Sequence, residues 1–143
     1  MSELKKTVGI IGLGLIGGSM AIDLKKRGFA GRVLGVEADK EAAQAAITIG
    51  LADEMVSIED CVDRSDIIVV AGPVGAAVKM LPDILDRIGD KKIVIDVCST
   101  KEHICSAVKY HPARKQFVCT HPMSGTEYSG RWAAQPGLFD GWA

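Results

Sequence analysis

The run GLGLIG, residues 12–17, is the feature that most narrows the folds open to this chain. It follows an apolar stretch, residues 7–13, that is typical of a buried strand, and residues 16–27 have the spacing of a helix with one apolar face. In such a strand–turn–helix unit the three glycines allow a tight turn, close approach of phosphates to the backbone, and close packing of helix on strand. The pattern in this context predicts a dinucleotide-binding site.

A second signal for a dinucleotide lies twenty residues beyond the last loop glycine, where Glu37 ends a strand-like run over residues 32–37. A carboxylate there accepts hydrogen bonds from ribose hydroxyls and repels a 2′-phosphate. Because neither Arg nor Lys occurs between Glu37 and Lys40, the sequence favours NAD over NADP; an ordinary strand-end acid is the alternative interpretation. The expected cofactor-binding residues are Gly12, Gly14, Leu15, Ile16, Gly17, Glu37, Ala71 and Pro73.

Strand-like apolar runs alternate with helix-like stretches along the whole chain. We expect strands at residues 7–13, 32–37, 54–58, 66–71, 91–97 and 116–120, and helices at 16–27, 40–49, 74–88 and 100–109, the third kinked or split at Pro82. Near-continuous apolar strands separated by helices are typical of a parallel sheet covered on both faces. The sequence therefore predicts an α/β fold with a doubly wound, mostly parallel sheet: one Rossmann-type domain spanning residues 1–143.

Composition and charge exclude several classes of function. The formal net charge is −1 with no basic block, which disfavours nucleic acid and anionic membranes as partners. Without a signal peptide or an apolar run of about 18 residues, we expect a cytoplasmic protein. The four cysteines form no C-x-x-C pair, so we expect no metal site and no disulfide framework, but reduced thiols that behave as small apolar residues.

Among the three histidines, His121 has the position of a proton acceptor. It follows the last predicted strand and precedes Pro122, at the edge of the sheet where ligands of open parallel sheets lie. A histidine there can accept a hydroxyl proton near neutral pH, although a structural role is the alternative. We expect His103 to be structural or exposed on a helix, and His111 to be solvated in a turn.

Ser99 faces the same edge and has a competing interpretation. The run STKE, residues 99–102, fits a capping box in which Ser99 caps a helix and Glu102 reaches back to it. A cap and a place in the crevice are compatible, because the helix start lies at the same edge of the sheet.

The segments IIGLGLIGGS, DVCSTK and HPMSGTEYSG together resemble the prephenate/arogenate dehydrogenase family of tyrosine biosynthesis. The resemblance implies an NAD-dependent oxidative decarboxylation of prephenate or arogenate. It implies that His121 is the catalytic histidine, which takes the proton of the ring 4-hydroxyl, and that Ser99 orients this histidine and the hydroxyl. Thr126 and Glu127 resemble substrate-side and entrance residues, so the implied substrate-binding set is Ser99, His121, Thr126 and Glu127.

The resemblance covers only the N-terminal half of the family. Its members carry a second, helical domain that dimerises and completes the site, so we expect this chain to lack that domain and to be inactive alone. Cys98 stands where the family commonly has glycine, and Ser124 where it has alanine; both replacements are small. Two alternatives stay open, namely another nicotinamide-dependent oxidoreductase of the same fold and a non-catalytic NAD-binding module. We also expect Trp132, Leu138, Phe139 and Trp142 to lack packing partners within the chain.

Overall fold

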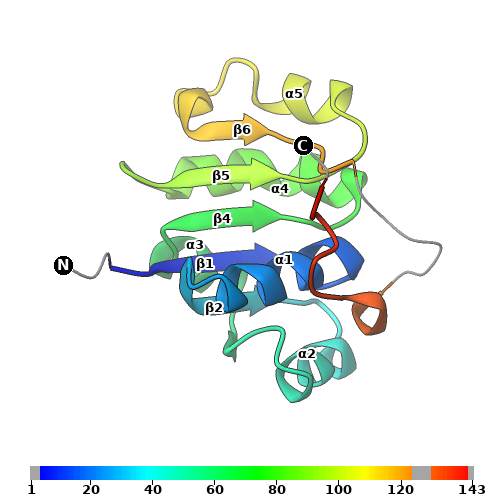
Figure 1. Cartoon of the computed structure of the whole chain (residues 1–143). Coiled ribbons are helices and arrows are strands. Elements are labelled where there is room, and N and C mark those ends of the chain that lie inside the picture. The colour runs from blue at the N-terminus through cyan, green and yellow to red at the C-terminus, as the bar shows by residue number, and fades with distance from the viewer. Residues whose placement is uncertain (1–3, 124–129, 142–143) are drawn as a thin grey trace.

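The computed structural model describes residues 4–123 and 130–141. Its six strands form one sheet in the order β3-β2-β1-β4-β5-β6, and each neighbouring pair is parallel (Figure 1). The predicted doubly wound parallel sheet is therefore confirmed. The elements are β1 (Lys6–Ile11), α1 (Leu15–Lys26), β2 (Ala30–Val36), α2 (Lys40–Thr48), β3 (Glu54–Met55), α3 (Ile58–Arg64), β4 (Ile67–Val70), α4 (Val74–Arg87), β5 (Ile93–Asp96), α5 (Glu102–Val108), η1 (Arg114–Gln116), β6 (Phe117–Cys119) and η2 (Arg131–Ala133).

Two separate apolar cores cover the two faces of the sheet. Side chains alternate between the faces along a strand, so Ile10 packs with residues of α1 and α2, whereas Ile11 packs with α3, α4 and α5. Figure 1 shows α1 and α2 in front of the sheet and α3 and α4 behind it. The winding reverses at β1, which lies between β2 and β4 and thus places the switch point of the sheet at the glycine loop.

Strand register brings four chain segments to one edge of the sheet. The last residues of β1, β4, β5 and β6 are consecutive partners across the sheet, since Ile11 pairs with Val70, Val70 with Asp96 and Asp96 with Cys119. The residues that leave these strands therefore lie along the same edge: Gly12, Ala71, Val97 and Thr120.

Two local elements differ from the sequence prediction. The run expected to be a strand over residues 54–58 holds only a two-residue strand, and it is followed by the unpredicted helix α3. The Ser57 hydroxyl caps α3 by accepting a hydrogen bond from the Asp60 N–H at 3.1 Å. Seven residues with several charges give too weak a helical period to be recognised. Pro82 does not split α4, which continues to Arg87.

The segment after residue 130 packs along α1. Its backbone N–H groups satisfy two buried polar side chains, since Gln135 donates to the Ser19 hydroxyl at 3.0 Å and Gly137 donates to the Asp23 carboxylate at 2.9 Å. Leu138 is only 7% exposed. The expectation that Leu138 lacks packing partners is therefore wrong.

The aromatic residues Trp132 and Phe139 of this segment differ in their surroundings. Trp132 is 71% exposed, as a side chain without a packing partner would be, whereas Phe139 lines a cavity with Met20 of α1. Trp142 lies outside the described residues.

Candidate functional site

The glycine loop has the backbone geometry that its sequence demands. Gly12 has a φ of +97°, in the left-handed region that favours glycine. A Cβ at Gly17 would lie 2.0 Å from the Gly12 carbonyl oxygen, so only glycine allows α1 to start this close to β1. At Gly14, which caps α1, no described atom lies within 4 Å of the Cβ position. The loop is thus tight on its inner side and open at Gly14, where a phosphate would approach.

The start of α1 offers donors to that opening. The first N–H groups of a helix, here those of Leu15, Ile16 and Gly17, have no acceptor within the helix, and its N-terminus carries a partial positive charge. Both features favour an anion such as a pyrophosphate. This helix end therefore fits the phosphates of a dinucleotide.

Glu37 is fixed beside the same loop. One oxygen of its half-buried carboxylate, Oε1, accepts a hydrogen bond from the Leu13 N–H at 2.7 Å. No described residue donates a hydrogen bond to its second oxygen, which can therefore accept one from a ribose hydroxyl. The contact joins the end of β2 to the glycine loop and fixes the acid beside this loop.

A crevice of about 340 Å³ runs from the start of α1 along the strand ends. It brings together five of the predicted site residues from four segments of the chain, namely Ile16, Ala71, Pro73, Ser99 and His121. The other lining residues are Gly72, Val74, Val97, Cys98 and Pro122. An elongated ligand bound at the glycine loop would therefore reach Ser99 and His121.

His121 lies where this crevice meets a second, smaller cavity. That cavity, of about 240 Å³, is lined by Met20, Val97, Thr120, His121, Pro122, Met123 and Phe139, so it is largely apolar. The imidazole is exposed, and no described residue forms a hydrogen bond with it. It is thus available for a ligand on either side.

Asp96, which the sequence analysis did not single out, holds both chain segments that lead to the candidate catalytic residues. Its side chain is fully buried, and its carboxylate accepts hydrogen bonds from the Cys98 N–H at 3.1 Å and the Thr120 N–H at 3.3 Å. The Thr120 hydroxyl donates to the Asp96 carbonyl oxygen. Ser99 directly follows Cys98, and His121 directly follows Thr120. One buried residue therefore fixes the backbone next to Ser99 and the backbone next to His121.

Lys101 compensates the buried charge of Asp96. Its ammonium group donates to the carboxylate and keeps 29% of its side chain exposed. A signal for this pair does exist in the sequence, because an aspartate at the end of the apolar run KKIVID is costly to bury unless a cation or several donors accompany it.

The capping box predicted at Ser99 is wrong. Helix α5 begins at Glu102, with Lys101 at the N-cap position and no side-chain hydrogen bond to the helix end. Two residues of the segment 97–101 instead donate to the Asp96 carboxylate, Cys98 through its N–H and Lys101 through its ammonium group. Ser99 is exposed and lines the crevice, so its hydroxyl is free of the competing structural role.

Cys98 forms part of the crevice floor. The residue is 6% exposed, and its thiol donates to the Gly72 carbonyl oxygen at 3.5 Å, which links the end of β5 to the turn before α4. Burial raises the pKa of this thiol, with the Asp96 carboxylate adding to the effect. Cys98 is therefore a neutral thiol that holds two strand ends together. The predicted substrate-side residues Thr126 and Glu127, and Ser124, lie outside the described residues.

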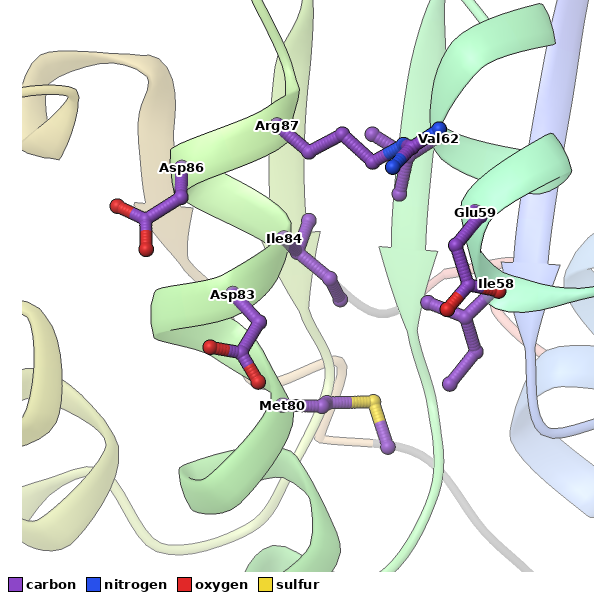
Figure 2. Close-up of a pocket in the computed structure, with 8 residues that line it drawn as sticks. All are labelled: Ile58, Glu59, Val62, Met80, Asp83, Ile84, Asp86 and Arg87. Carbon is purple, nitrogen blue, oxygen red and sulfur yellow. The ribbon is translucent and has the colours of Figure 1, made fainter.

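A larger cavity lies elsewhere and has the wrong chemistry for a dinucleotide. Figure 2 shows this groove of about 570 Å³ between α3 and α4, with apolar side chains and the carboxylates of Glu59, Asp83 and Asp86 around it. Arg87 is already paired with Asp63 at 2.7 Å. The negative charge opposes binding of a pyrophosphate, and none of the predicted site residues that the structure describes lines the groove.

The expectation that His111 is solvated is wrong. Its side chain is 13% exposed, its Nδ1 accepts a hydrogen bond from the Ala113 N–H at 3.0 Å, and its Nε2 lies 2.6 Å from Asp86. His111 therefore ties the loop after α5 to α4. This role depends on Asp86, 25 residues away, and cannot be read from the local turn. His103 is exposed on α5, as expected.

Comparison with known proteins gives a consistent result. The family model for the nucleotide-binding domain of prephenate dehydrogenase matches residues 20–143. A prephenate dehydrogenase of Bacillus subtilis is 36% identical over 98% of the chain, which spans 38% of that protein's length. The solved structure of prephenate dehydrogenase from A. aeolicus, in complex with hydroxyphenyl propionate and NAD⁺, is 28% identical with a TM-score of 0.81 and covers 99% of this chain and 50% of its own. Synechocystis arogenate dehydrogenase is 29% identical with a TM-score of 0.77, over 92% of this chain and 46% of its own.

Proposed function

Since the chain belongs to the prephenate dehydrogenase family, through its nucleotide-binding domain, we propose that it is the NAD-binding part of an enzyme that oxidatively decarboxylates prephenate or arogenate. The observation that carries this proposal is the crevice in which His121 and Ser99 meet Ile16 and Pro73. A dinucleotide site and a proton acceptor in one cavity are what a dehydrogenase requires.

The proposed cofactor is NAD, held by residues of three segments. The N–H groups at the start of α1 would bind the pyrophosphate, and Glu37 would accept hydrogen bonds from the adenosine ribose. The crevice lined by Ala71, Pro73 and Val97 would hold the nicotinamide end. NAD, when bound, would supply the hydride acceptor, and the protein would bind and orient it.

His121 is proposed as the general base. Its exposed imidazole can accept the proton of the substrate hydroxyl as the carbon bearing that hydroxyl is oxidised. The resulting ring ketone is conjugated to the carbon that bears the carboxylate, so CO₂ departs and the ring becomes aromatic. A positioned base of this kind contributes about 10²–10⁴ in rate.

Ser99 is proposed to orient the reacting hydroxyl. Its side chain lines the same cavity as His121, and its backbone is held by the Cys98–Asp96 hydrogen bond. Asp96 thereby acts through the chain as a positioning residue, because it also holds Thr120 next to His121.

The localisation, the class of substrate and the oligomeric state are proposed from the same family. No helix in the described part of the chain is long and apolar enough to cross a membrane. We infer a cytoplasmic enzyme with a small-molecule substrate, one that works as a homodimer together with a helical domain. Thr126 and Glu127 stay predicted substrate-side residues.

Two experiments test the proposal. Isothermal titration calorimetry of the 143-residue chain with NAD should show saturable binding at one site. NADP should bind to the same chain much more weakly. A chain that is folded by circular dichroism but binds neither nucleotide would contradict the proposed cofactor site.

The second experiment concerns His121 in a two-domain protein that carries this chain at its N-terminus. His121→Asn should lower kcat by about 10²-fold or more and leave the NAD dissociation constant nearly unchanged, because the imidazole acts on the substrate proton. His103→Asn, on the exposed face of α5, is the matched control and should leave both quantities unchanged. An unaltered kcat in His121→Asn would remove this residue from the mechanism.

A further inference from the structure

Two of the four cysteines lie against each other. Cys105 is on α5, Cys119 is the last residue of β6, and their Sγ atoms are 2.7 Å apart. A disulfide bond has a sulfur–sulfur distance of about 2.05 Å, so the two atoms are within about 0.7 Å of bonding distance. Cys61 and Cys98, by contrast, are buried and contact Ser65 and Gly72.

The pair is partly accessible to solvent. Both residues are half-buried, whereas Cys61 and Cys98 are 0% and 6% exposed. A small oxidant can therefore reach Cys105 and Cys119 without unfolding of the core. The thirteen residues between them run through the end of α5, η1 and β6, so the chain closes only a short loop between the two cysteines.

We propose that Cys105 and Cys119 are an oxidisable dithiol site, which a peroxide or a low-molecular-weight disulfide converts to an intramolecular disulfide between α5 and β6. The sequence gives no C-x-x-C signal for this site, because the two cysteines are fourteen positions apart and meet only in the folded chain.

With hydrogen peroxide as the oxidant, the chemistry balances in two steps. The Cys105 thiolate attacks one peroxide oxygen, the O–O bond breaks, and Cys105 becomes a sulfenic acid while hydroxide leaves as water. The Cys119 sulfur then attacks the Cys105 sulfur, the S–S bond forms, and the sulfenic oxygen leaves as a second water. Both sulfurs are oxidised, one peroxide is reduced, and the two thiol protons end in the two waters.

The environment of Cys119 raises the pKa of its thiol. Burial raises the pKa of the Cys119 thiol to about 11, and the Cys105 thiol and the Asp96 carboxylate add to the effect, whereas Arg114 opposes it. A protonated thiol is a poor first nucleophile, so the steps are written with Cys105 attacking first; the opposite order gives the same disulfide. The rate of disulfide formation should rise with pH, because Cys119 must lose its proton to attack.

The position of the site connects it to the crevice. Cys119 is followed directly by Thr120 and His121, and α5 is preceded by Lys101, the partner of Asp96. A disulfide here would link α5 covalently to the end of β6, two residues before His121.

The test is peptide mapping of the folded chain after treatment with hydrogen peroxide, under non-reducing conditions. We expect one species that has lost two hydrogen atoms and contains a Cys105–Cys119 linked peptide, with Cys61 and Cys98 still reduced. Its melting temperature should exceed that of the reduced chain by about 5–10 °C, because the crosslink restricts the unfolded state. The rate should increase between about pH 7 and about pH 9.

The controls separate this site from general thiol oxidation. Cys105→Ser and Cys119→Ser should each abolish the linked peptide and the rise in melting temperature, whereas Cys98→Ser should retain both. The mapping of the unsubstituted chain decides the matter even if a variant fails to fold. Sulfinic acid at a single cysteine, linkage through Cys98, or no reaction of the folded chain would each overturn the proposal.

Discussion

The glycine loop, through Ile16, and the segments that follow β5 and β6 line one crevice, and we call these two regions its two walls. Backbone conformation shapes the first wall, and a buried side chain shapes the second. At the glycine loop the backbone decides, since Gly12 needs a positive φ and Gly17 has no room for a Cβ. At the strand ends a single buried side chain, that of Asp96, holds the segments before Ser99 and His121. The first wall is built from neighbours in the sequence, and the second from residues 24 positions apart.

The two walls should therefore fail in different ways when they are altered. A side chain added at Gly17 has no room, because the nearest atom to its Cβ position is the backbone carbonyl oxygen of Gly12. A polar group removed at the strand ends leaves the surrounding donors without an acceptor, which costs stability and loosens the backbone next to His121.

The largest effect is expected from Gly17→Ala. Its Cβ would meet the Gly12 carbonyl oxygen at 2.0 Å, so α1 must move away from β1. We expect a loss of about 3 kcal/mol in the free energy of unfolding, the upper end of the cost of overpacking, together with loss of NAD binding. Urea denaturation and calorimetry measure the two effects.

Gly75→Ala is the matched control for that substitution. Gly75 also lies in the first turn of a helix, but no described atom lies within 4 Å of its Cβ position. The Gly75→Ala variant should gain about 0.5–1 kcal/mol in the free energy of unfolding. Equal behaviour of the two variants would mean that close packing does not set the shape of the glycine loop.

Asp96→Asn tests the other wall and should have the next largest effect. The amide keeps the size of the side chain but removes the charge that pairs with Lys101, and it turns a donor toward backbone N–H groups. We expect a loss of about 2–3 kcal/mol in the free energy of unfolding. In a two-domain protein, kcat should fall more than the affinity for NAD, and equal losses of both would contradict a positioning role. Asp66→Asn, which alters an exposed carboxylate that accepts from the Thr7 N–H, is the control.

The substitutions at Glu37 separate two roles of one carboxylate. Glu37→Ala should weaken NAD binding about tenfold and narrow the preference over NADP, because both the ribose acceptor and the negative charge are lost. Glu37→Gln keeps an oxygen for the Leu13 N–H and removes only the charge, so it should retain more affinity for NAD. If neither variant changes the preference between the two nucleotides, Glu37 serves only to shape the turn.

The smallest effect is expected for Glu54, a surface carboxylate on β3, and concerns the dependence of stability on pH. The hydrogen bond from Arg64 lowers the pKa of Glu54 to about 2, against the opposing effect of desolvation, and Arg32 adds to the lowering. This carboxylate contributes stability above its ordinary pKa of 4.5 and loses it as the pH falls toward 2. Glu54→Gln should flatten that part of the stability profile slightly, and high salt should mask the difference. A large change would mean that the exposed network matters more than either wall.

The same contrast explains what the sequence predicts and what it misses. Periodicity and the glycine spacing identify the fold, because each depends on residues close in the chain. The cap assigned to Ser99, the solvated His111 and the overlooked α3 are wrong or missing because distant partners or short length decide them. Asp96, Asp86 and the Cys105–Cys119 pair act across strands or between helices, and only the fold brings their partners to them.

The most direct test asks whether one NAD molecule contacts both the glycine loop and His121. In the chain saturated with NAD, nuclear Overhauser effects should connect the nicotinamide ring protons to the His121 imidazole, while amide signals of the glycine loop shift. Nicotinamide contacts confined to other residues, with NAD bound at the glycine loop, would contradict a site in which His121 stands beside the reacting carbon.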